Sequence, residues 1–420
     1  MPIQVTSRMN PFSPDQPVDW EYFAGREEEF QAIMDCLFQT KENMTHHIFI
    51  TGERGIGKTS LAKITMAMSK KDVIKTFTFN YLTVNCTCDS NDSLDDICVK
   101  ILKDLRKNTD TTIWEKFREK FSEFELKIWH FGIAAKTNTQ EKELDISKEF
   151  PFLLEKFFDG VKESFDGILV VVDELDRISD KLQIGSFFKS LFEKLNLDSY
   201  KRIMFLLCGL NKAYEDLVEQ HESLNRAFRF IELGYMTNKE SKEIILKALV
   251  KASPKVEIDG SILEKIAHIT GGMPYFVQQV GYSVFNADVD HFIDEEDYMK
   301  GLGIGKYIDV KDSALEQLAR KRFNKIYVDQ FRSNAYREVL KIMAGCSTDI
   351  VTKEFIRKKF KGKATKLNNA INALRDRNAI KSVPGKKGEY ELASRLFKEY
   401  LRMRTLAEDY TLDLNKNENK

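Results

Sequence analysis

The clearest chemical signal is a glycine-rich stretch, "GERGIGKTS", that runs from Gly52 to Ser60. It fits the pattern G-x-x-x-x-G-K-[ST], in which glycines let successive backbone N–H groups turn toward one anion. A lysine at the position of Lys58 reaches the β and γ phosphates of a nucleotide, and a hydroxyl at Thr59 coordinates Mg²⁺. The stretch therefore predicts a site for ATP with Mg²⁺, formed by Gly52, Glu53, Arg54, Gly55, Ile56, Gly57, Lys58, Thr59 and Ser60.

A second candidate pair, Asp173 and Glu174, follows five consecutive aliphatic residues from Ile168 to Val172. Such a run predicts a buried strand, and open α/β sheets bind ligands at the carboxyl ends of their strands. There Asp173 would hold Mg²⁺, directly or through water, and Glu174 would orient and polarise the attacking water. A simpler interpretation is that acidic residues merely end a strand in solvent, but the fitting phosphate loop upstream argues against it.

Short apolar runs alternate with helical segments around these residues. The run "HHIFIT" before the loop predicts a buried strand, and "SLAKITMAMSK" after it predicts a helix. Further strands are predicted in "TFTFNYLTVN", "KRIMFLLCGLN" and "FRFIELGYM". This alternation predicts an α/β fold with a parallel sheet that is covered by helices on both faces.

The rest of the chain has a different organisation. Beyond the last predicted strand the sequence is helical, and its end has the outline of a winged helix-turn-helix, three short helices and a glycine-turned hairpin. We expect an irregular N-terminal segment (1–20), a phosphate-loop base domain (21–236, with an insertion at about 106–150), a helical lid (237–305), a connecting helix (306–332), a winged helix (333–405) and a flexible tail (406–420).

Five stretches carry a resemblance to a known family: "FAGREEEF", "GERGIGKTS", "VVVDELDR", "LNRAFRFIEL" and "GGMPYFVQQ". Together they resemble the P-loop ATPases of the AAA+ and STAND groups, especially the origin-recognition initiator branch. The resemblance implies that Gly25 and Arg26 lie near the adenine. It implies that Asn211 is the polar sensor that contacts the γ-phosphate or the water.

The resemblance also implies an arginine finger that one subunit supplies to its neighbour. Arg226 lies where such ATPases carry this residue, and Arg229 is a weaker candidate. A guanidinium there would neutralise charge in the transition state. An exposed helix residue with no such role is the alternative interpretation of Arg226.

The lid departs from the common AAA+ pattern. Many AAA+ lids carry an arginine that senses the γ-phosphate, whereas this chain has Gly271-Gly272-Met273-Pro274, which resembles the G-x-P form of STAND switches. By that resemblance, Pro274 sits close to the nucleotide and couples the position of the lid to the state of the nucleotide. We therefore expect slow hydrolysis that times a switch.

Charge is concentrated near the C-terminus. Residues 353–388 carry twelve Lys and Arg side chains against two acidic ones, although the whole chain has 65 of each sign. Such clustering is typical of a surface that binds a phosphate backbone. The candidate DNA contacts are Lys358, Lys366, Asn369, Lys386 and Lys387. Winged helices also bind proteins, so a protein partner is the alternative.

Composition excludes several other classes. A hydrophobic share of 42% and a charged share of 31% suit a globular protein, and no window is apolar enough to predict a membrane span. The N-terminus does not resemble a signal peptide. Six cysteines without a CxxC pair predict free thiols in a cytoplasmic protein, and His46, His47 and His130 lack metal-ligand spacing.

These observations favour an ATP-binding and hydrolysing switch that assembles into a homo-oligomer with nucleotide and docks on DNA. The alternative is a signal-transducing or defence-type regulatory NTPase whose winged helix binds protein. A small-molecule kinase that shares the phosphate loop is a third class, which the Asp-Glu pair and the winged helix disfavour.

Overall fold

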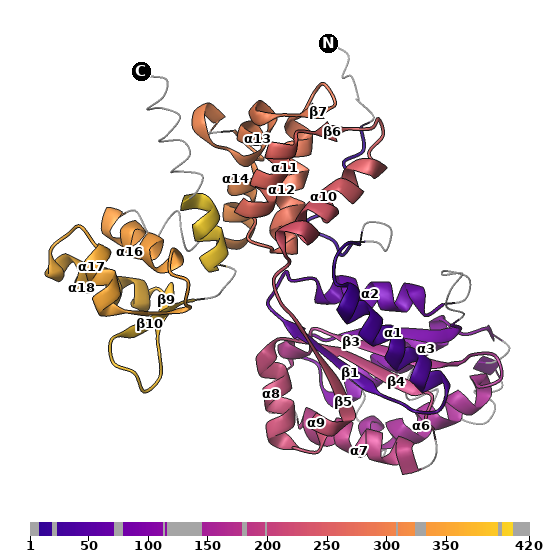
Figure 1. The fold of residues 1–420 in the computed structure, drawn as a ribbon. Coiled ribbons are helices and arrows are strands. Elements are labelled where there is room, and N and C mark those ends of the chain that lie inside the picture. The colour runs from indigo at the N-terminus through magenta and orange to yellow at the C-terminus, as the bar shows by residue number, and fades with distance from the viewer. Residues whose placement is uncertain are drawn as a thin grey trace, which may run out of the picture. The chain divides into compact units, whose positions relative to one another are not determined.

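The computed structural model of the chain contains two units that differ in architecture (Figure 1). The sheet unit comprises Asp19–Glu21 and Arg26–Gly234, and the helical unit comprises Met1–Val18, Tyr22–Gly25 and Tyr235–Lys420. The structure describes residues 8–18, 23–70, 79–111, 114–115, 145–178, 183–197, 200–307, 310–323, 333–393 and 397–405. The predicted phosphate loop and the Asp-Glu pair both belong to the sheet unit.

A five-stranded parallel sheet forms the centre of the sheet unit, in the order β2-β3-β4-β1-β5. The strands are β1 (His47–Gly52), β2 (Tyr81–Thr87), β3 (Gly167–Asp173), β4 (Ile203–Cys208) and β5 (Phe228–Leu233). The aliphatic β3 lies between β2 and β4 and is buried along its whole length. The predicted α/β fold with a parallel sheet is therefore confirmed.

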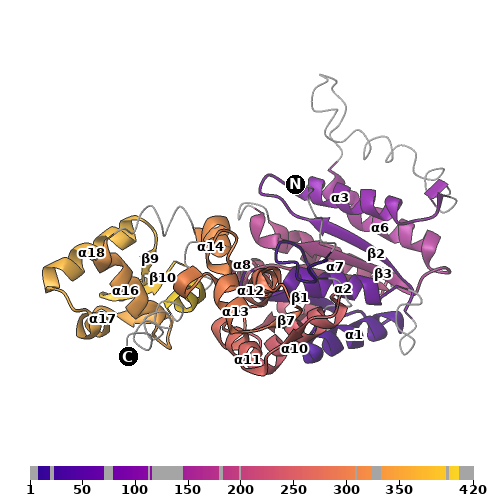
Figure 2. The same cartoon turned by 90° about the horizontal axis from the view of Figure 1, so that it is seen from above.

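Helices cover both faces of this sheet, and the alternation of side chains along β3 shows why. Ile168, Val170 and Val172 join a buried cluster with α3 (Leu94–Lys107), α6 (Ile146–Val161) and α7 (Ile184–Leu197). Leu169 and Val171 are also buried, on the opposite face. Figure 2 shows α3 and α6 side by side on one face and α1 (Glu27–Lys41) on the other, with α2 (Lys58–Met68). Two more helices, α8 (Asn211–Gln220) and α9 (Leu224–Ala227), connect β4 to β5.

The predicted insertion at 106–150 lies mostly outside the described residues. At its edges, α3 continues to Lys107 and α6 begins at Ile146. Phe150 on α6 is fully buried in the core of the sheet unit. The last residues of the predicted insertion therefore belong to a core helix.

Short helices build the region of the helical unit that was predicted to be a lid. They are α10 (Asn238–Lys251), α11 (Gly260–Ile269), α12 (Pro274–Ala287) and α13 (Glu295–Leu302), with a small parallel pair of β6 (Glu257–Ile258) and β7 (Phe292–Ile293). A 3-10 turn (Gly305–Tyr307) follows, and the predicted connecting helix begins as α14 (Ala314–Leu318) and a π-helical turn (Ala319–Phe323). The N-terminal segment packs on α12, because Gly281 leaves room for the Phe12 ring, which a Cβ would approach to 2.4 Å.

The C-terminal part of the helical unit has three helices and a three-stranded antiparallel sheet. The elements are α16 (Asn334–Ala344), β8 (Ile350–Thr352), α17 (Lys353–Lys359), α18 (Ala364–Asp376), β9 (Ile380–Ser382) and β10 (Glu389–Leu392), with strand order β8-β10-β9. Gly385 and Gly388, both with positive φ, close the β9–β10 hairpin. The three helices and the hairpin agree with the predicted elements, whereas β8 was not predicted, and the winged helix stays a prediction. The predicted tail, residues 406–420, lies outside the described residues.

Two further predictions concern membranes and thiols. Among the described residues, no helix combines the length and apolar character that crossing a membrane requires. All six cysteines are free thiols, and only Cys346 is not buried. The histidine at position 130 lies outside the described residues.

Candidate functional site

The glycine loop joins β1 to α2 in a conformation that side chains would disfavour. Gly52, Gly55 and Gly57 all have positive φ, and a Cβ on Gly52 would lie 2.8 Å from the backbone oxygen of Leu233 on β5. Gly57 is the N-cap of α2, whose first turn carries no acidic side chain. The positive end of the helix and its free backbone N–H groups are thus available to an anion.

Lys58 lies over this loop. Its ammonium donates hydrogen bonds to the backbone oxygens of Gly52, at 2.7 Å, and Glu53, at 3.0 Å. Burial lowers the pKa of Lys58, although the carboxylate of Asp176 and other nearby groups oppose the shift. An anionic ligand would stabilise this partly desolvated cation. The terminal phosphates of a nucleotide are such a ligand.

Thr59 and Asp173 come together from α2 and β3, as the sequence predicted for two Mg²⁺ ligands. The Thr59 hydroxyl donates to Asp173 Oδ2 at 2.7 Å, and Asp173 is buried, with 6% of its surface exposed. Neighbouring oxygen ligands of octahedral Mg²⁺ lie about 3 Å apart, since the metal–oxygen distance is about 2.1 Å. The two oxygens therefore fit a shared Mg²⁺ without a large rearrangement.

Glu174 leaves the strand in a left-handed backbone conformation, with φ 58°. Its carboxylate forms an ion pair with Arg177 Nε at 2.8 Å, and its backbone N–H donates a hydrogen bond to Asp173 Oδ1 at 2.8 Å. Burial raises the pKa of Glu174, while Arg177 opposes the shift. Nearby, Arg54 of the loop pairs with Asp176 at 3.2 Å, which ties the glycine loop to the end of β3.

Asn211 is held by two residues that sequence reasoning missed. Thr51 donates its hydroxyl hydrogen to Asn211 Oδ1 at 2.5 Å, and Asn211 Nδ2 donates to Glu232 Oε1 at 3.1 Å. The register of β1 against β5 pairs Thr51 with Glu232. The contact of Asn211 with Glu232 could be found only from this pairing of strands that are far apart in the sequence. The two hydrogen bonds orient the amide of Asn211 at the same edge of the sheet.

The predicted arginines occupy three different environments. Arg26 is buried, donates to the backbone oxygen of Gly234 and pairs with Glu29 at 3.3 Å. Arg226 is exposed on α9, whereas the exposed Arg229 lies 3.9 Å from Cys36 Sγ of its own chain. Exposure leaves Arg226 accessible to a neighbouring subunit, and its finger role stays a prediction.

Gly25 and Pro274 belong to the helical unit. A Cβ on the buried Gly25 would lie 3.0 Å from Glu240 Oε1, and Pro274 is the first residue of α12. Just before it, a Cβ on Gly272 would lie 2.1 Å from the backbone oxygen of Met236, so the start of α12 is packed against the segment that precedes α10. The predicted roles of Gly25 and Pro274 toward the nucleotide stay predictions.

The basic surface predicted near the C-terminus is exposed. Lys366 and Asn369 lie on the outer face of α18, whose opposite face buries Leu367 and Ile371. Lys358, Lys386 and Lys387 are exposed as well. Two of these lysines have acidic partners, since Lys358 pairs with Glu354 at 3.1 Å and Lys386 with Glu389 at 3.6 Å.

Comparison with known proteins agrees with this geometry. Residues 22–198, which include the glycine loop, Asp173 and Glu174, match the family model described as the AAA ATPase domain. The fold is similar to the ORC2 protein of Aeropyrum pernix in its ADPNP-ADP complexes (14% identity, TM-score 0.53, 94% of this chain and 99% of that chain). It is also similar to a Walker-type ATPase of Pyrococcus abyssi (15% identity, TM-score 0.50, 93% and 99%). No curated protein matches the sequence significantly.

Residues 22–198 thus match the model of the AAA ATPase domain, and the chain has the α/β parallel-sheet fold of P-loop ATPases. The resemblance to AAA+ ATPases inferred from the sequence agrees with this domain match, and the similarity to the ORC2 protein concerns the fold. The domain match ends before Asn211 and Arg226.

Proposed function

We propose that this AAA ATPase-domain chain binds ATP with Mg²⁺ at the Gly52–Ser60 loop and hydrolyses it slowly to ADP and phosphate. The observation that carries the proposal is the 2.7 Å contact between Thr59 and Asp173 beneath the glycine loop, beside the partly desolvated Lys58. Two oxygens that can bind Mg²⁺ and a cation that can bind phosphate thus lie at one edge of the sheet.

Each residue has a separate task in this reaction. Lys58 exchanges its two backbone carbonyl partners for phosphate oxygens, and the N-terminus of α2 donates backbone N–H groups to the same anion. Glu174 orients the attacking water and accepts its proton, and the amide of Asn211 contacts the γ-phosphate or that water. Bound Mg²⁺, held by Thr59 and Asp173, would neutralise charge on the β and γ phosphates.

The test is a titration of the purified chain with a fluorescent ATP analogue, with Mg²⁺ and with EDTA. Lys58→Ala is expected to abolish binding, while Lys63→Ala, an exposed lysine on the same helix, binds like the wild type. Glu174→Gln is expected to retain ATP and to turn it over at least a hundredfold more slowly, the usual scale for loss of a catalytic base. Brisk turnover by Glu174→Gln would refute the role assigned to Glu174.

The chain is further proposed to assemble with ATP into a homo-oligomer in which Arg226 serves the neighbouring site. The exposure of Arg226 on α9 supports this proposal. Mixing Arg226→Ala with Glu174→Gln should restore part of the lost turnover, because the second variant donates an intact arginine to the intact site of the first. The doubly substituted chain mixed with Arg226→Ala is the control. Equal turnover in both mixtures contradicts a finger supplied in trans.

Nucleotide-dependent movement of the lid is proposed as the output of the switch. The close packing of Gly272 against Met236 gives the start of α12 a fixed place relative to the first residues of the lid, so the segment before Pro274 can transmit a movement. Native mass measurements with ADP and with a non-hydrolysable ATP analogue test the coupling. Pro274→Ala is expected to bind ATP but to lose the difference in assembly between the two nucleotides.

DNA is the proposed partner of the exposed basic surface on α17, α18 and the β9–β10 hairpin. Reversing Lys358, Lys366 and Lys387 to Glu should weaken DNA binding by the full chain and flatten its salt dependence, since each lost phosphate contact removes about 0.9 from the slope of log K against log salt. Reversing the exposed Lys63, Lys148 and Lys255 is the matched control.

A regulatory or defence-type NTPase with a protein partner is the second candidate function. The ion pairs of Lys358 with Glu354 and of Lys386 with Glu389 favour it, because they offset part of the basic charge. DNA affinity that is the same in both triple variants would support this candidate.

A further inference from the structure

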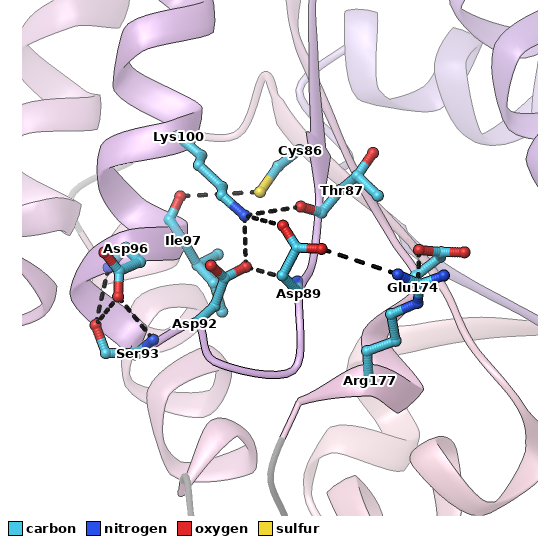
Figure 3. A network of polar contacts seen from close by, with 10 residues as sticks. All are labelled: Cys86, Thr87, Asp89, Asp92, Ser93, Asp96, Ile97, Lys100, Glu174 and Arg177. Atoms are coloured by element: carbon cyan, nitrogen blue, oxygen red, sulfur yellow. Dashed lines mark hydrogen bonds and ion pairs between the residues drawn. The ribbon is translucent and has the colours of Figure 1, made fainter.

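Glu174, the residue proposed to activate water, forms an ion pair with Arg177, and Arg177 also lies near a second carboxylate. Arg177 Nε contacts Glu174 Oε2 at 2.8 Å, while Nη1 of the same guanidinium faces Asp89 Oδ1 at 3.8 Å (Figure 3). Guanidinium carries five N–H donors on a rigid fork, so one arginine can turn between two carboxylates. Arg177 therefore lies between the candidate base and an alternative anion.

The register of the sheet explains why these groups meet. Thr87 pairs with Asp173 across β2 and β3, and the backbone N–H of Cys88 donates to the backbone oxygen of Asp173 at 3.0 Å. Asp89 and Glu174 are the residues that follow at adjacent strand ends. Both carboxylates are consequently delivered to the edge of the sheet where the phosphate loop lies.

Asp89 is held in place by α3. Lys100 donates to Asp89 Oδ2 at 3.1 Å, to Asp92 Oδ2 at 2.6 Å and to the backbone oxygen of Thr87 at 3.1 Å. The backbone N–H of Asp89 donates to Asp92 Oδ2 at 2.7 Å. The second carboxylate is thus anchored, whereas Arg177 is the half-exposed, long side chain that can move.

We infer that Arg177 is a latch that restrains Glu174, and that its transfer to Asp89 frees the carboxylate to orient water. The inference rests on the proposed function, because it assigns Arg177 and Asp89 as positioning residues for the hydrolytic step. A carboxylate whose lone pairs are occupied by a guanidinium is a poor partner for water, and an exposed ion pair shifts such an equilibrium by about two- to fivefold.

Three variants test the latch through the direction in which each changes kcat. Arg177→Ala is expected to raise kcat by about two- to fivefold with unchanged ATP affinity. Asp89→Ala is expected to lower kcat by a similar factor, because Arg177 then stays on Glu174. The double variant should behave like Arg177→Ala, since Asp89 acts only through Arg177. Lys162→Ala removes a comparable exposed pair at spacing i, i+3 (Lys162–Asp159, 3.1 Å) and should leave kcat unchanged.

Several results would overturn the latch: a kcat lowered by Arg177→Ala, no change in either single variant, or an Asp89→Ala effect that persists without Arg177. A readout independent of turnover is the Nε–H resonance of Arg177, which should shift in Glu174→Gln and not in Lys162→Ala. An unresponsive resonance also refutes the ion pair. Absent wild-type turnover together with a responsive resonance contradicts the proposed function and leaves the pair established.

Discussion

His47 is expected to make the sheet unit less stable as the pH falls. It is the first residue of β1, is buried, and stacks on Phe192 with ring centroids 3.7 Å apart. Its Nδ1 accepts a hydrogen bond from the backbone N–H of Phe205 at 3.2 Å, which requires that nitrogen to be unprotonated. Burial, with a smaller contribution from His46, lowers the pKa of His47 to about 3.

The size of the effect follows from the two pKa values. The imidazole of an unfolded chain has a pKa of about 6.5, so below that pH the unfolded state binds a proton that the folded state does not. The stabilisation is complete above the unfolded pKa and is lost as the pH falls from there toward the folded pKa. Relative to pH 7.5, the loss from His47 alone is about 1.4 kcal/mol at pH 5.5.

Urea unfolding followed by tryptophan fluorescence measures this loss, because Trp114 lies in the core of the sheet unit. His47→Asn keeps an acceptor oxygen for Phe205 but does not titrate. This variant should be less stable at pH 7.5 and at pH 5.5, because the ring packing is lost. Between these pH values its free energy of unfolding should fall by about 1.4 kcal/mol less than that of the wild type. His46→Asn, at an exposed site, should retain the wild-type loss. Equal losses in His47→Asn and the wild type would refute the reasoning.

Two further substitutions test the site and the lid. Thr51→Val removes the hydroxyl that holds Asn211 and should lower kcat by about two- to tenfold, the value of one hydrogen bond, at unchanged ATP affinity in a nucleotide titration; a kcat equal to the wild type would contradict the sensor role. Gly272→Ala places a Cβ 2.1 Å from the backbone oxygen of Met236, at positive φ, and should destabilise the helical unit by roughly 1–3 kcal/mol in thermal unfolding. Gly260→Ala, where a Cβ meets no atom within 4 Å, should be neutral.

The sheet and the glycine loop could be predicted because their signals are local. A run of aliphatic residues predicts β3 wherever it lies in the fold, and the spacing of Gly52, Gly57 and Lys58 fixes the loop between a strand and a helix. The contact between Thr59 and Asp173 followed from the chemistry that a phosphate loop needs. These features therefore required no knowledge of the strand order.

The contacts that Asn211 and Arg177 make across the sheet could not be predicted in the same way. Glu232 meets Asn211 because β5 pairs with β1, and Asp89 nears Arg177 because β2 pairs with β3. Both contacts depend on the order of strands, which no short stretch of sequence encodes. Likewise, the packing of the N-terminal segment on α12 depends on one small residue far along the chain.

The conformation of Glu174 explains how two adjacent carboxylates can have different tasks. In an extended strand, neighbouring side chains point to opposite faces, so Glu174 would point away from the site that Asp173 faces. At Glu174 the chain instead turns into a left-handed conformation with φ 58°, and a 3-10 turn (Leu175–Arg177) follows at once. A non-glycine residue at positive φ is costly and persists where the surrounding structure requires it. Here the cost places Glu174 at the edge beside Asp173 and brings Arg177 within reach of it, so one backbone turn supplies both the candidate base and its restraint.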